Sequence, residues 1–328
     1  MAFKIGNIEL KERVILAPMA GVTSFSYRKF MRPFGCGITY TEMISDCGLI
    51  YDNKRTRQMI YSDGSDRPLA IQLFGGDKET LLKGVELLES SGIEYDILDL
   101  NFACPVPKVT KNNGGSSWLL DLDKLYDTTK AIVEKSTKPV SAKIRLGYNE
   151  VNVDETVKVL QDAGVSFIMI HARTRKELYT GKPHFDFLKN VRDILHIPFG
   201  VSGNIYTVKD ALDALEITRA DAILVARGGI GNPNLIRNIN LALEGKEYDE
   251  TLKFYEQKDY LFKFTDLLIK EKGETRAISI LKGLAPKFFP SPMPHSKELR
   301  QELTLNMKCR NDMENILNEY EKKFAEVY

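Results

Sequence analysis

A cysteine stands in an unusual setting near the first third of the chain, in the stretch DLNFACPVPKVTKNNGGSS (residues 99–117). Cys104 comes shortly after an apolar run that ends at Leu100, and it is followed by prolines, lysines and a pair of glycines. Cysteine often packs as a small hydrophobic residue, which is one explanation of its presence. The other explanation is chemical, because a thiol that stands over a bound substrate can donate a proton to a carbon atom.

Residues able to bind a ligand recur at the ends of other apolar runs. Gln72 lies late in one run, Lys143 lies within another, and His171 closes a third. An outward-pointing lysine and a core histidine are the structural alternatives for the last two. Gln72 can donate and accept hydrogen bonds at once, which suits the edge of a heterocycle. Polar residues at so many run ends are hard to explain by packing alone.

These residues need a scaffold that brings the ends of separate strands together. Short apolar or β-branched runs alternate with helix-like segments, a pattern that indicates parallel strands joined by helical crossovers. The expected strands are Val14–Ala17, Ile38–Thr41, Leu69–Leu73, Ile97–Leu100, Val140–Ile144, Phe167–Ile170, Ile197–Val201 and Ala222–Val225. The expected helices are Phe25–Phe34, Lys78–Ser90, Asp123–Lys135, Val153–Asp162, Phe185–Val191, Val208–Leu215 and Pro233–Leu243. Eight such units predict an α/β protein with a (β/α)8 TIM barrel, in which all strands end at one face. A doubly wound sheet is less consistent, because no GxGxxG motif follows the first run.

The last two strand ends carry glycines and an arginine, in VSGNI and VARGGIGNP. In TIM barrels this corner commonly binds phosphate through backbone N–H groups and a helix N-terminus. Gly203 and Gly228 allow close backbone approach, and Arg227 offers a planar fork. Tight turns capped by glycine are the alternative reading. A phosphate here, with a flat ring across the mouth of the barrel, describes a phosphorylated heterocycle, and FMN fits that description.

The chain changes character after residue 245. Strand-like runs stop, and amphipathic helices are expected over Tyr255–Lys270, Arg276–Leu284, Ser296–Leu303 and Asp312–Glu326, with the proline-rich connector PKFFPSPMPH between the second and the third. We therefore predict a barrel domain over residues 1–245 and an all-helical domain over residues 246–328.

The helical domain contains a local basic block. Between residues 276 and 310 there are seven basic residues and two acidic ones, which gives this segment a net charge of +5, whereas the whole chain carries a net charge of +1. The basic residues are Arg276, Lys282, Lys287, Lys297, Arg300, Lys308 and Arg310. A solvated helical face would explain such a block. With Lys108 close to Cys104, the block also fits a track for RNA phosphates that leads to the barrel mouth, as base flipping would require.

Composition excludes several other classes of protein. No apolar stretch approaches the roughly 18 residues that span a bilayer, and the first residues lack the pattern of a signal peptide. The four cysteines are scattered without metal-ligand spacing, which is typical of reduced thiols. We therefore expect a cytoplasmic protein, a monomer, with neither a metal nor a membrane partner.

Several stretches, in order, resemble the tRNA dihydrouridine synthases: APMAGVTSFSYR, TEMIS, NFACPVPKV with GGSS, SAKIRLG, IHARTR with YTGK, and ARGGIGNP. The resemblance runs from about residue 5 to about residue 240 and continues weakly through KGLAPKFF. It is greatest to the bacterial branch that has a compact helical C-terminal domain. The resemblance implies an FMN-dependent enzyme that reduces the C5–C6 double bond of selected uridines in tRNA, with NADPH or NADH as reductant.

The resemblance also implies roles for particular residues. Cys104 would protonate C5 while reduced flavin delivers a hydride to C6. Asn101 and Arg173 would face the uracil or its phosphates. From the charge of the basic block, and not from the resemblance, we expect the RNA to follow Lys108, Arg276, Lys282, Lys287 and Arg300. The flavin would be bound by Pro18, Met19, Ala20, Gln72, Lys143, His171, Ser202, Gly203, Asn204, Ala226, Arg227 and Gly228.

The chain departs from the family pattern at small residues. Glycine is usual at the positions of Ala103 and Ala226, and Asn-Gly-Asp is usual where this chain has Ser202-Gly203-Asn204. The last change bears on the phosphate end of the flavin.

Three other functions are weaker. An FMN barrel acting on a free pyrimidine, like dihydroorotate dehydrogenase, has no need of a basic helical domain. A tRNA-binding protein with secondary catalysis has no need of Cys104, Lys143 and His171. A metal-dependent hydrolase would need a His-x-His or carboxylate cluster, which the sequence lacks.

Overall fold

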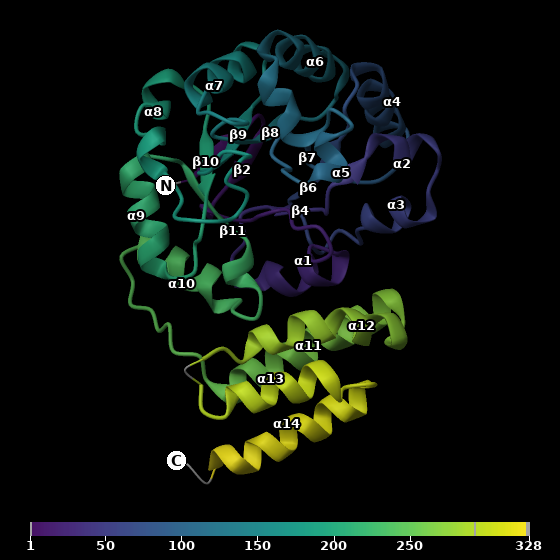
Figure 1. The fold of residues 1–328 in the computed structure, drawn as a ribbon, viewed down its shortest axis with the longest axis vertical. Helices are drawn as coiled ribbons and strands as arrows, with labels where there is room; N and C mark the ends of the chain where they lie inside the picture. Colours follow the sequence, from purple (N-terminus) through teal and green to yellow (C-terminus); the bar gives the residue numbers. More distant parts are fainter. Residues whose placement is uncertain (1, 292, 326–328) are drawn as a thin grey trace.

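The computed structural model describes residues 2–291 and 293–325. Within them, eight parallel strands form a central ring that helices surround (Figure 1). The order around the ring is β4-β3-β11-β10-β9-β8-β7-β6, and a pairing between β4 and β6 closes it. The strands are β3 (Val14–Leu16), β4 (Thr39–Tyr40), β6 (Leu69–Phe74), β7 (Ile97–Asn101), β8 (Val140–Arg145), β9 (Phe167–His171), β10 (Phe199–Ser202) and β11 (Ala222–Val225). All eight predicted strands are present, and the predicted TIM barrel is confirmed.

Helices cover the outside of the ring because each buries one apolar stripe against the strands. Local chemistry fixes where they begin: the Asp77 side chain accepts from the backbone N–H groups of Glu79 and Thr80, and Thr207 and Asp210 form a capping box. The helices are α1 (Phe25–Met31), α2 (Asp46–Ile50), α3 (Lys54–Met59), α4 (Lys78–Glu89), α5 (Pro107–Thr110), α6 (Leu122–Lys135), α7 (Val153–Asp162), α8 (Val191–Ile194), α9 (Val208–Thr218) and α10 (Asn234–Leu243).

One predicted helix is wrong. The segment Phe185–Val191 forms a 3₁₀ helix over Phe185–Leu188, and α8 begins only at Val191. Leu188 in the 3₁₀ helix and Val191 in α8 are both buried. Each short helical segment therefore packs one apolar side chain into the core, and a continuous helix is not needed.

An antiparallel hairpin that the sequence analysis missed closes the amino-terminal end of the barrel. It consists of β1 (Phe3–Ile5) and β2 (Ile8–Leu10), joined at Gly6, which has a φ of 58°. Ile5 and Leu10 pack into the same buried cluster as interior barrel residues. Alternating apolar residues around Gly6-Asn7 were the available signal. A short further strand, β5 (Ile44–Ser45), pairs with the end of β6.

The helical region lies beside α1, below the barrel in Figure 1. It consists of α11 (Phe254–Lys272), α12 (Glu274–Leu284), α13 (Ser296–Leu305) and α14 (Arg310–Ala325). Aromatic rings join it to the barrel: Phe264 lies 5.5 Å from both Tyr27 and Phe30, measured between ring centroids. Residues 246–253 form neither helix nor strand, and the domain boundary at 245/246 stays a prediction. The predicted helix end at Glu326, and Pro292 in the proline-rich connector, lie outside the described residues.

Candidate functional site

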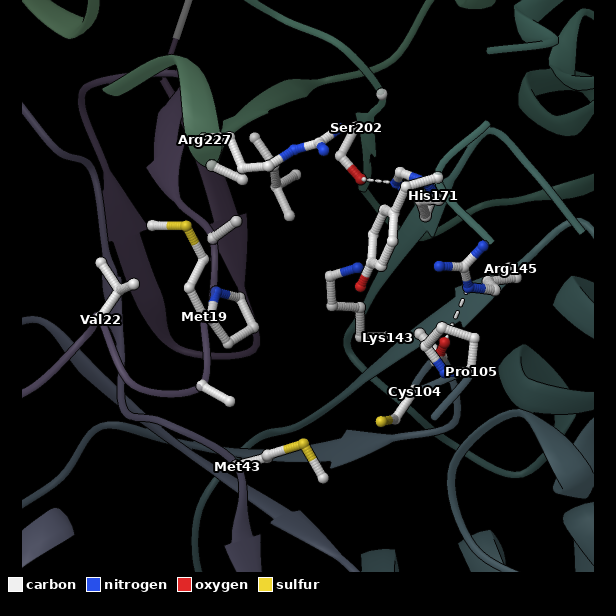
Figure 2. Close-up of a pocket in the computed structure, with 18 of the residues that line it drawn as sticks. Met19, Val22, Met43, Cys104, Pro105, Lys143, Arg145, His171, Ser202 and Arg227 are labelled. Atoms are coloured by element: carbon white, nitrogen blue, oxygen red, sulfur yellow. Dashed lines mark hydrogen bonds between the residues drawn. The ribbon is translucent and has the colours of Figure 1, made fainter. Parts of the chain in front are cut away.

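A cavity of about 420 Å³ opens at the carboxyl ends of the barrel strands (Figure 2). This volume is in the range of small-molecule and cofactor sites. The predicted residues that line it are Pro18, Met19, Ala20, Gln72, Asn101, Cys104, Lys143, His171, Ser202, Gly203, Asn204, Ala226, Arg227 and Gly228. The barrel thus brings together side chains from every part of the first 228 residues, as its geometry requires.

Cys104 is held at one side of the cavity by its own loop. The side-chain oxygen of Asn101 accepts from the backbone N–H groups of Ala103 and Cys104, at 3.1 and 2.9 Å. The carbonyl oxygen of Cys104 accepts from the backbone N–H and the hydroxyl of Ser116, both at 3.0 Å. Gly115 must be glycine, since its φ is 58° and a Cβ there would lie 2.6 Å from that carbonyl oxygen. The GGSS stretch therefore fastens the cysteine loop in place.

The Cys104 thiol is a proton donor at neutral pH. Burial raises its pKa, and the nearby Arg145 and Lys143 lower it by less. The side chain is half-buried and lies across the cavity from Ser202 and Arg227 (Figure 2). A protonated thiol beside a bound molecule suits acid catalysis rather than nucleophilic attack.

Lys143 points into the cavity, so the outward-pointing alternative is wrong (Figure 2). Burial, with the neighbouring charge of Arg145, lowers the pKa of its ammonium group to about 8. The amine therefore stays largely charged at neutral pH, where it can meet an anionic or electron-rich ligand edge.

His171 is neutral, and its tautomer follows from its two partners. Burial and four neighbouring cations, Lys143 first, hold its pKa well below the usual value. Its Nε2 lies 3.4 Å from a guanidinium nitrogen of Arg173, and its Nδ1 lies 3.2 Å from the hydroxyl of Ser202. A guanidinium only donates, so Nε2 accepts and Nδ1 carries the proton.

Arg173 does not line the cavity, contrary to the expectation that it faces the uracil. Its side chain is buried, and it donates to the carbonyl oxygens of Thr180 and Gly181 at 2.9 and 2.7 Å. Its remaining contact is His171, so the structure places Arg173 behind the site, where it fixes the histidine and the YTGK loop.

Several residues that line the cavity were not among the predicted site residues, and Met43, Arg145 and Tyr179 are three of them. Arg145 donates to the carbonyl oxygen of Ala103 at 2.8 Å, one residue before Cys104. Its spacing of two residues from Lys143 on one strand places both on one face, which is a signal that the sequence offered. The Tyr179 ring lies 5.2 Å from the guanidinium groups of both Arg145 and Arg227, and only the fold of its loop brings it there.

At the predicted phosphate end, glycines let neighbouring segments of the chain pack closely. A Cβ at Gly228 would lie 2.0 Å from the carbonyl oxygen of Ile205, and a Cβ at Gly203 would lie 2.7 Å from Pro183. Asn204 adopts a left-handed conformation with a φ of 49° and accepts from Arg227 at 3.3 Å. In the Ser202-Gly203-Asn204 segment, which departs from the family pattern, Ser202 thus contacts His171 and Asn204 contacts Arg227. Ala103 and Ala226, the other two departures, also line the cavity. These residues fit FMN.

A second, basic hollow of about 590 Å³ lies between the barrel and the helical region, outside the first cavity. Basic residues line it from both sides: Lys29, Lys54, Arg57, Lys270, Lys272 and Arg276, against the acidic residues Asp63 and Glu271. Lys54, Lys270 and Arg276 are exposed and form no ion pair with any described residue. A smaller cavity of about 220 Å³ borders it, and Val22 lines both this cavity and the one that holds Cys104.

The other predicted RNA-binding residues are dispersed. Lys108 is exposed on α5, Lys287 is exposed beside the loop after β11, and Lys282 is half-buried. Arg300 is directed inward, because it donates to the carbonyl oxygen of Phe289 at 2.9 Å and to the hydroxyl of Ser296 at 3.1 Å. Arg300 therefore fastens α13 to the preceding segment through one guanidinium nitrogen, and its contact with RNA stays a prediction.

No helix in the described ranges is both long and apolar enough to cross a membrane. Across residues 2–291 and 293–325, no cluster of three or more His, Cys, Asp or Glu side chains could hold a metal ion.

Fold and site together define a (β/α)8 barrel protein with a thiol, a lysine and a glycine-rich corner around one cavity. Comparison with known families agrees: residues 15–326 match the family model described as "Dihydrouridine synthase (Dus)", and the chain belongs to that family. The family predicted from the motifs is confirmed.

Individual relatives agree in sequence and in structure. "tRNA-dihydrouridine synthase B" of Pasteurella multocida is 32% identical over 243 residues, covering 74% of this chain and 73% of the relative. The protein of the same name from Pseudomonas aeruginosa is 29% identical over 301 residues, covering 91% and 90%. Among solved structures, an old yellow enzyme homologue from Zymomonas mobilis superposes with a TM-score of 0.55 at 13% identity, covering 76% of this chain and 93% of that one. At that identity the likeness shows the barrel fold alone.

Proposed function

We propose that the protein is an FMN-dependent tRNA-dihydrouridine synthase that reduces the C5–C6 double bond of uridines in tRNA. The observation that carries the proposal is the protonated Cys104 thiol, held over a cavity with a phosphate corner, in a chain of the dihydrouridine synthase family. Names of relatives that specify tRNA support the substrate class.

In the proposed cofactor site, one end of the cavity would bind the phosphate of FMN and the other end would bind its ring. Gly203, Asn204, Arg227 and Gly228, with Ser202 and Ala226, would hold the phosphate and its ribityl chain. Pro18, Met19 and Ala20 would lie against the ring, and Gln72, Lys143 and His171 would meet its polar edges. When bound and reduced by NADPH or NADH, FMN would supply the hydride for C6 of the uracil.

Residues of the protein would supply the proton for C5 of the uracil. The Cys104 thiol would donate its proton to C5 of the uracil. The thiolate that remains would lie near the positive charges of Lys143 and Arg145, which lower the pKa of the thiol. Asn101 keeps the cysteine loop in place and lines the cavity beside it. The apolar wall around Met19, Val22 and Met43 would limit the access of water.

The basic hollow between the barrel and the helical region would bind the phosphates of folded tRNA. Lys54, Lys270 and Arg276 are exposed and unpaired among the described residues, so they can neutralise phosphates without breaking an ion pair. Lys108, Lys282 and Lys287 lie outside this hollow and would contact other phosphates of the tRNA. A free pyrimidine would need none of these cations. We further propose that the protein acts in the cytoplasm as a monomer.

The main test compares the wild-type protein with Cys104→Ala. Purified wild-type protein should carry a yellow flavin and form dihydrouridine in tRNA transcripts, mapped by mass spectrometry. Cys104→Ala should retain the flavin and form dihydrouridine at least about 100-fold more slowly, because general acid catalysis is worth that much. Full activity of Cys104→Ala would remove the cysteine from the mechanism, and a wild-type protein unable to bind FMN would refute the cofactor.

A second test addresses the RNA surface. Lys54→Gln with Arg276→Gln should weaken tRNA binding and lower its dependence on salt by about two phosphate contacts. The control is Lys158→Gln with Lys209→Gln, two exposed lysines on α7 and α9. Equal weakening in both double variants would place the RNA surface elsewhere.

A further inference from the structure

A buried carboxylate lies one layer below the cavity, and the proposed reaction gives it no step. Asp99 stands two residues before Asn101 on β7, on the same face of the strand but deeper in the barrel. It is fully buried, and no ion pair with a described residue neutralises it. Burying a charge is costly, and an asparagine or an apolar residue would be cheaper at this position. The free-energy cost of burying the Asp99 carboxylate therefore suggests that it has a function.

Hydrogen bonds lead from Asp99 to the backbone of Cys104. One Asp99 oxygen accepts from the hydroxyl of Ser141 and the other accepts from Nε2 of Gln72, both at 2.6 Å. Oε1 of Gln72 then accepts from Nδ2 of Asn101 at 2.7 Å. Oδ1 of Asn101 finally accepts from the N–H groups of Ala103 and Cys104. All four side chains are buried, so water does not compete for these bonds.

The chain has a direction, and both of its ends set it, because the backbone N–H groups of Ala103 and Cys104 only donate and an ionised Asp99 only accepts. An amide side chain has a donor end and an acceptor end of nearly equal shape, so Gln72 and Asn101 could each be turned over. Above a pH of about 7 Asp99 is ionised and only accepts, so Gln72 must turn its NH2 toward it and its oxygen toward Asn101. Asn101 must then turn its oxygen toward the cysteine loop.

We propose that Asp99 is a positioning residue, which through the orientation of Gln72 and Asn101 places Cys104 for proton transfer. The proposal rests on the proposed role of Cys104. Asn101 and Gln72 also line the cavity, so the same orientation decides which of their atoms a bound ring meets. The charged or titratable groups near Asp99 are Lys143 on β8 and Tyr40 on β4, and neither takes part in the chain of hydrogen bonds.

The test compares two variants that change the side-chain hydrogen bonds around Asp99. Asp99→Asn keeps the shape and loses the acceptor-only character, whereas Ser141→Ala removes a donor and leaves the carboxylate in place. The first readout is hydrogen exchange at the amides of residues 103 and 104 in the holoenzyme at about pH 8, where Asp99 is ionised. The second is the rate at which tRNA reoxidises the reduced enzyme, separated into kcat and KM.

In Asp99→Asn, exchange at these two amides should rise about 10-fold or more, and kcat should fall by about 10- to 100-fold at unchanged KM for tRNA. Ser141→Ala should stay near the wild type in both. The double variant Asp99→Asn with Gln72→Glu moves the carboxylate one step along the chain, where it still accepts from Asn101, so the protection of both amides should return.

Unchanged exchange in Asp99→Asn, an equal rise in Ser141→Ala, or no recovery in the double variant would each overturn the proposal. If Asp99→Asn does not fold, Gln72→Ala cuts the chain in its middle and must raise the same two exchange rates. The exchange readout does not depend on catalysis, so a fully active Cys104→Ala would refute the role of the cysteine and leave the positioning measurable.

Discussion

The pH dependence of folding should reveal the cost of the buried Asp99 carboxylate. Burial raises the pKa of Asp99 from 3.8 to about 7, against the opposing hydrogen bonds from Ser141 and Gln72 and the charge of Lys143. The folded protein therefore keeps a proton on Asp99 between these two values, while the unfolded chain has released it. The stability that this proton contributes is complete below the unfolded pKa and is lost as the pH rises through about 7.

The size of the loss follows from the shift. One pKa unit corresponds to about 1.4 kcal/mol, so wild-type protein should lose about 3 kcal/mol of unfolding free energy between about pH 5 and about pH 8 through this group alone. Asp99→Asn does not titrate at this position. The difference in unfolding free energy, wild type minus Asp99→Asn, should therefore fall by about 3 kcal/mol over that range.

Urea unfolding followed by the fluorescence of Trp118, the single tryptophan, measures this difference. Asp127→Asn, an exposed carboxylate on α6, is the control and should show a nearly constant difference from the wild type. A constant difference for Asp99→Asn as well would mean that Asp99 is ionised in the folded protein across the whole range, and the reasoning from burial would fail.

Two further predictions concern the flavin corner and the barrel wall. Gly228→Ala should lower the amount of bound FMN at least about 10-fold, because the added Cβ would lie 2.0 Å from the carbonyl oxygen of Ile205. The control is Gly283→Ala, whose Cβ meets nothing within 4 Å, and this variant should retain FMN. Flavin absorbance per protein measures both variants, and equal retention of FMN would contradict the assignment. Arg28→Met should cost about 3–5 kcal/mol of unfolding free energy, because it leaves Asp66 buried without its partner at 2.8 Å. Urea unfolding measures this cost, and a value below about 1 kcal/mol would refute it.

Much of the fold and part of the site could be predicted from local patterns. Apolar runs that alternate with helical periodicity are local, and a closed ring of parallel strands is what eight such units can form. Cys104, Lys143 and Gln72 were predictable because each lies at or near a strand end, and strand ends share one face of a barrel. The hairpin at Gly6 also had a local signal.

Side-chain direction beyond the strands was not predictable. Arg173 and Arg300 have the right charge and positions in the sequence to meet RNA or substrate, yet both turn inward to donate to backbone carbonyl oxygens. A buried carbonyl oxygen must be hydrogen-bonded, and nothing in the sequence shows which carbonyls lie within reach of a guanidinium.

The sequence by itself determined the barrel, the family and many of the residues that surround the cavity, because periodicity, turn chemistry and strand ends are set by neighbours along the chain. Tertiary structure alone decided three things. It joined Lys54 of the barrel with Lys270 and Arg276 of the helical region into one basic hollow. It placed Arg173 behind His171. It also buried Asp99 where its pKa rises, since burial and hydrogen-bond partners come from strands far apart in the chain.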